Sequence, residues 1–227
     1  MTIALIVTVF VTISAGNWQT RRAADKIERQ QLLDERARLP ALGLRSDAVS
    51  ITDVEWRSIA VTGRPLTALT ILIDNRVHNT RAGYHVLTPI EPIDGGPAIV
   101  VNRGWLAAGD DRSVAPTVPS LPSPTTVSGV AIAWPSRTFE LKDVPVEAPA
   151  GQAPVWQGVT LERYRDSTRL GVQPVIMQQA SASDDGLVRQ WPAPALGVEK
   201  HRMYSLQWYS FAALAVVLYL MLNLKRV

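Results

Sequence analysis

An uncharged stretch near the C-terminus constrains this chain more than any other feature. The stretch from Tyr204 to Leu224 is mostly apolar and carries no charged side chain. As an α-helix that rises about 1.5 Å per residue, it is long enough to cross a hydrocarbon core about 30 Å thick. Tyr204 and Trp208 lie near its start, where aromatic rings prefer the level of the lipid headgroups. The sequence therefore predicts a transmembrane helix over residues 204–224.

A second apolar segment opens the chain. Thr2–Gly16 is uncharged, and as a helix it reaches about 22 Å, which is short for a span. Three interpretations are open: a signal peptide cleaved after Ala15, a buried core helix, or a transmembrane helix with Trp18 as its interface anchor. A signal peptide has a positively charged segment before its apolar stretch, and no Lys or Arg stands there in this chain. We therefore favour the transmembrane helix.

These two segments divide the chain into three parts. We expect a transmembrane helix over residues 1–18, a β-rich domain with an N-terminal stalk helix over residues 19–203, and a second transmembrane helix over residues 204–224. Charge leaves the side of the middle domain undecided. Basic residues between Arg21 and Arg29 favour a cytoplasmic position, whereas Lys225 and Arg226 favour a cytoplasmic C-terminus, which would put the domain outside.

The middle region changes from helical to strand-like patterning. The charged segment Thr20–Leu39 predicts a helix that ends before Pro40, and Thr160–Arg169 predicts a short helix. Asp74–Arg76 predicts a turn. Apolar runs of strand length cover residues 56–64, 68–74, 83–91, 98–106, 125–134, 155–159 and 174–179. The fold class predicted is an α+β membrane protein, with two transmembrane helices flanking one antiparallel β-barrel or sandwich-like domain.

Composition and motifs exclude several classes of function. The chain contains no cysteine, which removes disulfides and thiolate metal sites. Its net charge of +3, without a basic run interleaved with aromatic residues, gives no indication of nucleic-acid binding. The nucleophile elbow, the phosphate-binding loop, the dinucleotide fingerprint and the zinc-protease motif are all missing from the sequence. We therefore do not expect an enzyme.

Histidines are the main candidates for metal ligands. His201 lies three residues before the second apolar stretch, where it is either a metal ligand or an interfacial polar residue. His78 and His85 form only a weak candidate pair. A further candidate site is the strand that contains Arg103 and Trp105, which a period of two places on one face with Val101. Either Arg103 stacks on Trp105 at the rim of the sheet, or it contacts an anion or ligand.

Four blocks carry a resemblance to a known family. They are Gly16-x-Trp18-Gln19 with Arg22 and Lys26, then Asp74-Asn75-Arg76 with Gly83-Tyr84-His85-Val86-x-Thr88-Pro89, then Val101-Asn102-Arg103-Gly104-Trp105, and finally His201-x-x-Tyr204-x-x-Gln207-Trp208. In this order, between two apolar ends, the blocks resemble the Surfeit-locus (Shy-type) cytochrome c oxidase assembly factor family over nearly the whole chain. Tyr209 departs from the family, in which Phe is usual.

The resemblance implies a membrane-bound assembly factor that is not an enzyme. It would bind haem a transiently and assist its insertion into the catalytic subunit of cytochrome c oxidase. The implied partners are that subunit and the lipid bilayer, with haem a synthase as a further candidate and no nucleic acid. The implied location is the inner (plasma) membrane of a bacterial cell, with the central domain periplasmic, because no organellar transit peptide is visible.

Residue by residue, the resemblance assigns a haem site. His201 would be the metal ligand. The other residues that would contact the haem or a partner are Trp18, Gln19, Arg22, Tyr204, Trp208, Arg103 and Trp105. Two alternatives are kept: a membrane-tethered scaffold without haem that docks on an oxidase subunit, and an unrelated membrane-anchored enzyme.

Overall fold

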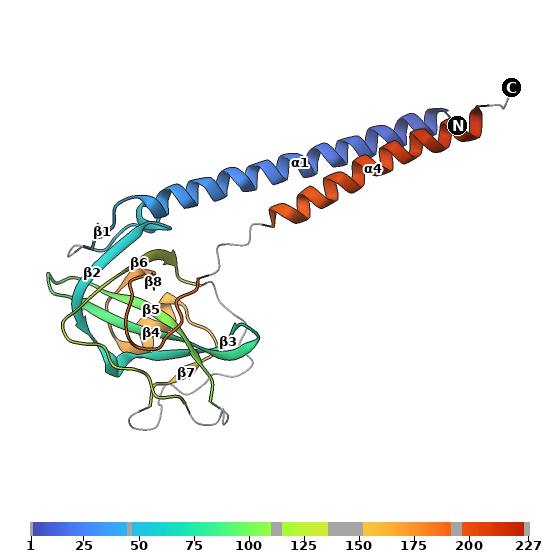
Figure 1. The fold of residues 1–227 in the computed structure, drawn as a ribbon. Helices are drawn as coiled ribbons and strands as arrows, with labels where there is room; N and C mark the ends of the chain where they lie inside the picture. Colours follow the sequence, from blue (N-terminus) through green and yellow to red (C-terminus); the bar gives the residue numbers. More distant parts are fainter. Residues whose placement is uncertain (1, 45–46, 110–114, 136–151, 192–196, 225–227) are drawn as a thin grey trace. The chain divides into compact units, whose positions relative to one another are not determined.

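The computed structural model describes residues 2–44, 47–109, 115–135, 152–191 and 197–224. The chain divides into two compact units (Figure 1). The first, which we call the helix pair, contains Met1–Glu35 and Pro192–Val227. The second, which we call the barrel domain, contains Arg36–Trp191. The basic residues Lys225 and Arg226, which bear on the predicted orientation, lie outside the described residues.

The helix pair consists of α1 (Thr2–Arg38) and α4 (Val198–Asn223). Both helices are long and apolar enough to cross a membrane. Only 11% of the most apolar window of α1 and 6% of that of α4 are buried, so neither is the core helix of a soluble protein. The choice between a transmembrane helix and a signal peptide for the first segment stays a prediction. Helix α1 continues without a break into the charged segment predicted as a stalk and ends shortly before Pro40.

Three contacts show that α1 and α4 are antiparallel. The hydroxyls of Thr2 and Tyr219 lie 2.9 Å apart at one end of the pair. Further along, the Tyr209 hydroxyl donates a hydrogen bond to Asn17 Oδ1 at 2.8 Å. At the other end, Gln19 contacts His201. Residues early in α1 therefore face residues late in α4. The N-terminal end of α1 and the C-terminal end of α4 lie at the same end of the helix pair.

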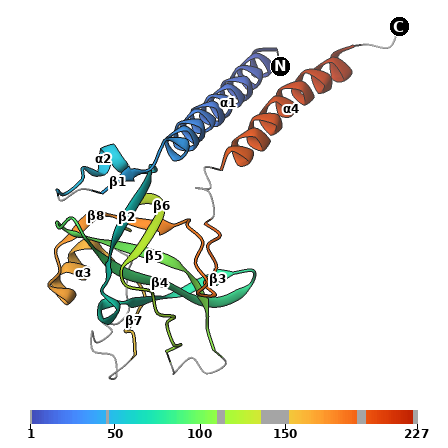
Figure 2. The ribbon, with the colours of Figure 1, turned by 60° about the vertical axis from the view of Figure 1, so that its left-hand side comes forward.

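Eight strands build the sheet of the barrel domain among the described residues (Figures 1 and 2). Its order is β1-β2-β6-β8-β5-β4-β3-β7, and a further pairing between β2 and β4 closes five of these strands into a barrel. The strands are β1 (Leu42–Gly43), β2 (Ser58–Pro65), β3 (Ile71–His78), β4 (Arg81–Pro92), β5 (Ala98–Ala107), β6 (Thr125–Ala133), β7 (Val155–Trp156) and β8 (Val172–Gln179).

The predicted fold class is confirmed, with one refinement to the strand directions. Most neighbours are antiparallel, but β8 runs parallel to β5, and the short strands β1 and β7 run parallel to β2 and β3. A long connection between β5 and β8, which includes β6, allows the parallel pairing. Closure through β2 and β4 leaves the five barrel strands without a free edge.

Three apolar clusters stabilise the barrel domain, and the two larger ones form two layers. Inside the barrel, Ile59, Ile90 and Val101 belong to a core contributed mainly by the five barrel strands. Outside it, a second core contains Trp156 and Tyr164, and it is covered by α3 (Leu161–Thr168) and β7. Sequence alternation places successive residues of one strand in these two different layers, since neighbouring side chains point to opposite faces.

Short segments complete the domain. Helix α2 (Ile51–Val54) and the 3₁₀ helix η1 (Thr67–Leu69) flank β2. Arg36, the first residue of the barrel domain, donates hydrogen bonds to the carbonyls of Thr52 and Glu55. Helix α3 begins at an N-cap, where the Thr160 hydroxyl accepts from the Arg163 N–H, and it confirms the short helix predicted over Thr160–Arg169.

The predicted turn at Asp74–Arg76 was wrong. This segment is a bulge inside β3, where the pairing with β4 shifts between Ile73 and Arg76 and Asn75 has a φ of 58°. The chain reverses later, at Asn79 and Thr80, which have φ values of 46° and 65°. Positive φ at both central residues is typical of a two-residue hairpin turn. Asp-Asn resembles a turn because both residues tolerate the left-handed conformation, which a bulge also uses.

Candidate functional site

The helix pair brings His201 and Gln19 together. His201 lies in the first turn of α4, and its Nδ1 is 2.6 Å from Gln19 Oε1 on α1. Both side chains are half-buried. Because they are 182 positions apart in the chain, only the antiparallel packing of the two helices can produce this contact. The sequence singled out both residues through their separate motifs, and the structure places those motifs side by side.

The His201–Gln19 contact determines the tautomer of the imidazole. A carboxamide oxygen can only accept a hydrogen bond, so Nδ1 of His201 carries the proton and donates it to Gln19 Oε1. In the neutral form of the ring the lone pair is then on Nε2, which is the nitrogen that can coordinate a metal ion. Metal-binding histidines in proteins are commonly oriented in this way through their second ring nitrogen. If the haem that the sequence resemblance implies were bound here, Nε2 of His201 would be the atom that ligates its iron.

Tyr209 holds the two helices at the register that this contact needs. A Cβ atom added at Gly16 would lie 2.6 Å from Cε1 of Tyr209, so the ring rests directly on the backbone of α1. The hydroxyl donates to Asn17 Oδ1 and lies 3.3 Å from the hydroxyl of Thr20. Sequence reasoning missed this role, because nothing local to Tyr209 indicates which residue of another helix it contacts.

The other residues of the helix pair that were predicted to contact haem lie along its surface. Trp18 is 49% exposed, and the Arg22 guanidinium lies 5.8 Å from the centre of its ring. Trp208 makes an edge-to-face contact with Phe211, with ring centres 5.9 Å apart. Tyr204 is 53% exposed. Within the described helices, none of these aromatic side chains has a hydrogen bond or ring contact with His201.

Arg103 and Trp105 belong to the barrel domain, and the prediction that they share a face was wrong. The pairing of β4 and β5 runs from Leu87–Asn102 to Val86–Gly104, so Arg103 is an extra residue in a β-bulge. Gly104 has a φ of 144°, and a Cβ there would lie 2.9 Å from Leu187 Cβ, which explains why glycine occupies it. The bulge moves Trp105 onto the face opposite to Arg103.

Arg103 is buried rather than placed at a rim. Its guanidinium donates to the Pro119 carbonyl at 2.8 Å and to Asp185 at 3.2 Å. Asp185 also accepts two hydrogen bonds from Arg189, at 2.6 and 2.7 Å. Burial lowers the pKa of Arg103, Asp185 opposes that effect, and Arg189 adds to it. Sequence reasoning missed Asp185 and Arg189, which come from a polar segment after the last strand.

Asp185 remains charged despite its burial. Desolvation alone would raise its pKa, but the hydrogen bonds from Arg189, from the Leu187 N–H and from Arg103 outweigh it and lower the pKa. The segment that carries Asp185 is also joined to β5 by paired backbone hydrogen bonds between Trp105 and Val188. This part of the barrel domain is therefore a fixed ionic cluster.

Trp105 packs on the opposite face, against the β3–β4 hairpin. It is 8% exposed, and its indole N–H donates to the Arg76 carbonyl at 2.8 Å. Its ring centre lies 5.3 Å from that of His78. The interactions of Trp105 are those of a structural residue, and it does not stack on Arg103.

The two barrel histidines have separate partners. The ring of His78 contacts Trp105 and Asn79. His85 Nδ1 lies 3.3 Å from Asn102 Nδ2, and its ring meets Trp191 edge-on at 5.5 Å. Burial and the nearby positive charge of Arg76 lower the pKa of His85 to about 4. No group of three or more His, Cys, Asp or Glu residues suited to a metal ion exists among the described residues.

Comparison with known proteins finds relatives that match both the helix pair and the barrel domain. A model of the SURF1 family matches residues 6–213. An uncharacterized SURF1-like protein of Mycobacterium tuberculosis is 25% identical over 231 residues, which cover 96% of this chain and 80% of that protein. A SURF1-like protein of Monosiga brevicollis is 23% identical over 234 residues, covering 98% of this chain and 87% of that protein.

A shorter match links the chain to an animal protein. Surfeit locus protein 1 of Mus musculus is 28% identical over 105 residues, which cover 40% of this chain and 34% of that protein. The resemblance read from the four sequence blocks is thereby confirmed. Since the family model extends from the first helix through the barrel domain and into the last helix, this protein belongs to the SURF1 family.

Proposed function

We propose that this protein is a membrane-anchored assembly factor for a haem–copper cytochrome c oxidase. The observation that carries the proposal is membership of the SURF1 family over residues 6–213, together with two apolar helices that flank a barrel. The proposed partners are the catalytic subunit of the oxidase and the lipid bilayer, with haem a synthase as a further candidate. In this role the protein acts as a chaperone and catalyses no reaction of its own.

The proposed cargo is haem a, held at the His201 end of the helix pair. A neutral imidazole can ligate haem iron, and cationic side chains can pair with haem propionates. His201, whose ring contacts Gln19, would supply the imidazole, and Arg22 and Lys200 would supply positive charge on the two helices. Trp18, Tyr204 and Trp208 offer exposed or half-buried aromatic surface for the macrocycle on the same helices.

The proposed topology places both chain ends in the cytoplasm and the barrel domain in the periplasm of a bacterial cell. Two helices that each cross the membrane once require the ends to lie on the same side. The bacterial relative supports a plasma membrane location. The basic segment after the first apolar stretch favours the opposite orientation by the positive-inside rule. We give more weight to the family resemblance, which supports a barrel domain outside the cytoplasm.

Oxidase assembly is tested by removing the protein from its own host. We expect the deletion to lower cytochrome c oxidase activity and the haem a content of the isolated catalytic subunit, while subunit synthesis continues. The wild-type chain should restore both quantities. Normal oxidase activity in the deletion strain, at normal haem a content, would contradict the proposed function.

A variant separates the haem-carrying role from the alternative of a haem-free scaffold. His201→Ala should leave the protein in the membrane and fail to restore the haem a content of the oxidase. His78→Ala, which removes a histidine from the barrel domain, is the matched control and should restore it fully. Complete rescue by His201→Ala would favour the scaffold.

A further inference from the structure

An irregular segment follows the last strand of the barrel domain and leads toward α4. We call this segment, residues 181–191, the tether. Within it the described backbone forms one isolated bridge, between Val188 and Trp105. Irregular segments are usually mobile, because few contacts hold them. The tether is instead held by contacts along its whole length, and the residues that hold it include members of two of the four sequence blocks.

The first half of the tether is held by β6 and β5. The Ser181 N–H donates to the Ser128 carbonyl at 3.0 Å, and the Ser128 N–H donates to the Ser181 hydroxyl at 3.2 Å. Further along, Asp185 accepts from Arg103 at 3.2 Å, and both side chains are almost wholly buried. Because a buried charge that loses its partner is strongly unfavourable, this ion pair keeps the tether on β5.

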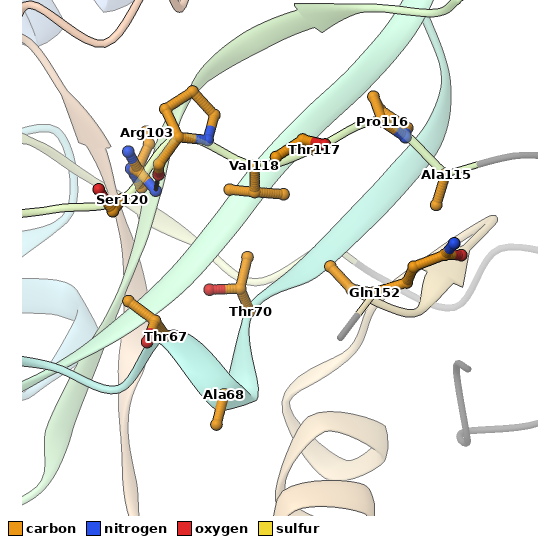
Figure 3. A pocket seen from close by; sticks show the side chains of 12 residues that line it. Thr67, Ala68, Thr70, Arg103, Ala115, Pro116, Thr117, Val118, Ser120 and Gln152 are labelled. Carbon is orange, nitrogen blue, oxygen red and sulfur yellow. Dashed lines mark hydrogen bonds between the residues drawn. The ribbon is translucent and has the colours of Figure 1, made fainter. Parts of the chain in front are cut away.

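The ion pair is separate from the cavity that Arg103 borders. That cavity has a volume of about 600 Å³ and is lined mainly by short side chains, among them Thr67, Ala68 and Val118 (Figure 3). Asp185 does not line it. The contacts of the Arg103 guanidinium therefore support a role in holding the tether, and they do not present a charge to the cavity.

The middle of the tether packs on the bulge in β5. Val188 exchanges two backbone hydrogen bonds with Trp105, at 2.8 and 2.9 Å. Leu187 is 7% exposed and belongs to an apolar cluster with Tyr84 of β4. A Cβ at Gly104 would lie 2.9 Å from Leu187 Cβ, so the glycine of the bulge makes room for the tether.

Trp191 makes the last contact of the tether with the barrel. Its indole N–H donates to the Gln179 carbonyl at 2.8 Å, and its ring meets that of His85 edge-on, with ring centres 5.5 Å apart. Five residues, 192–196, separate it from Gly197, the N-cap of α4. A chain of this length extends to about 20 Å at most, so a fixed Trp191 limits how far the start of α4 can move from the barrel domain.

The barrel domain and the helix pair are joined through α1 and through residues 192–196. Two units of one chain move relative to each other by default unless a further contact restrains them. Release of Trp191 would lengthen the second connection by the freed residues of the tether. The start of α4, which carries His201, would then lose that restraint.

We propose that the residues that hold the tether are positioning residues for the haem site, and that Trp191 matters most because it is the contact nearest to α4. They restrict the distance between the His201 end of α4 and the barrel domain. Arg103 and Trp105 then act on the site through the tether, without touching haem. The use of this restraint in haem transfer rests on the proposed function, whereas the restraint itself does not.

Spin labels test the restraint in the full chain in lipid nanodiscs. The chain has no cysteine, so Thr126→Cys on β6 and Met203→Cys on α4, both at exposed positions, give two specific labelling sites. The test variant is Trp191→Ala. Trp134→Ala is the matched control, because Trp134 is also half-buried, donates its indole N–H to a backbone carbonyl and contacts one tyrosine ring, but does so away from the tether.

We expect a narrow distance distribution in the labelled parent and in Trp134→Ala, and a broad one in Trp191→Ala. Trp191→Phe, which keeps a ring beside His85 but loses the indole donor, should give an intermediate width. Amide exchange in residues 187–190 should be about tenfold faster in Trp191→Ala and unchanged in Trp134→Ala. A broad distribution in the labelled parent, or equal widths in the two alanine variants, would overturn the proposal.

Complementation of the deletion strain tests whether the restraint serves oxidase assembly. At equal amounts of protein in the membrane, Trp134→Ala should restore the haem a content of the catalytic subunit, Trp191→Phe should restore part of it, and Trp191→Ala much less. Full restoration by Trp191→Ala would overturn the positioning role. A deletion strain with normal oxidase would instead contradict the proposed function, and the distance distributions would still decide whether the tether restrains α4.

Discussion

His85 makes the stability of the barrel domain depend on pH. Its pKa is lowered to about 4 in the folded protein, first by burial and second by Arg76, whereas an unfolded histidine titrates near 6.5. Between these two values the unfolded chain binds a proton that the folded chain does not. The free energy of unfolding therefore decreases as the pH falls below about 6.5, by up to roughly 3 kcal/mol near pH 4.

Denaturant unfolding of wild type and His85→Gln at pH 7.5 and pH 5 measures this contribution. Other acidic groups also titrate in acid, so the quantity to compare is the difference between the two proteins. We expect His85→Gln to lose less stability than wild type between these pH values. Identical losses would mean that His85 is protonated as easily in the folded barrel as in the unfolded chain.

Trp105 contributes packing and one hydrogen bond, and two substitutions separate them. Trp105→Phe keeps most of the aromatic body but leaves the Arg76 carbonyl without its indole donor, which should cost about 1 kcal/mol. Trp105→Ala also removes a nearly buried ring and should cost about 3–5 kcal/mol. Chemical denaturation followed by circular dichroism gives both values, and an alanine variant as stable as the phenylalanine variant would contradict the packing role.

At the scale of elements, the contact between Gly16 and Tyr209 sets the register of the helix pair. Gly16→Leu places a side chain where the Tyr209 ring now lies, and overpacking of this kind costs about 1–3 kcal/mol. Spin labels on Leu5 and Leu218 should report a narrow distance distribution in the wild type and a broad one in Gly16→Leu. Ala213→Leu, at an exposed position of α4, is the control and should leave the distribution narrow.

Elements with strong local signals could be predicted from the sequence. Helix α3 matches the short helix predicted over Thr160–Arg169, and strands β4 and β5 match the apolar runs at residues 83–91 and 98–106. The bulges in β3 and β5 could not be predicted, because an extra residue changes the pairing with another strand and leaves local composition unchanged. Barrel closure depends on the distant pairing of β2 with β4, which has no local signature either.

For the candidate site, the sequence identified individual residues but not the contacts between them. His201 and Gln19 were identifiable because each lies in a short motif beside an apolar segment. Their hydrogen bond was not, because it depends on how the two helices pack. Arg103 was recognised, but its burial and its pairing with Asp185 depend on a bulge and on a polar segment 82 positions later in the chain. Contacts between distant segments are the part that single-sequence patterns do not encode.

At the scale of the whole molecule, the proposed topology predicts that the barrel domain lies in the periplasm. A reporter enzyme that is active only in the periplasm, inserted at Pro122 in the connector before β6, should be active. The same reporter fused after Val227 is the control and should be inactive. Activity at Val227 with silence at Pro122 would place the barrel domain in the cytoplasm and contradict the proposed topology.

The central claim is that the helix pair carries haem a through His201, and one measurement tests it most directly. Wild type and His201→Ala are purified in mild detergent from cells that make haem a, and their absorption spectra are compared at equal protein concentration. We predict that the wild type contains haem a with a histidine-ligated spectrum, and that the variant remains in the membrane but has lost most of the bound haem. A His201→Ala protein with the same haem content and an unchanged spectrum, or a wild type that never contains haem, would contradict this account.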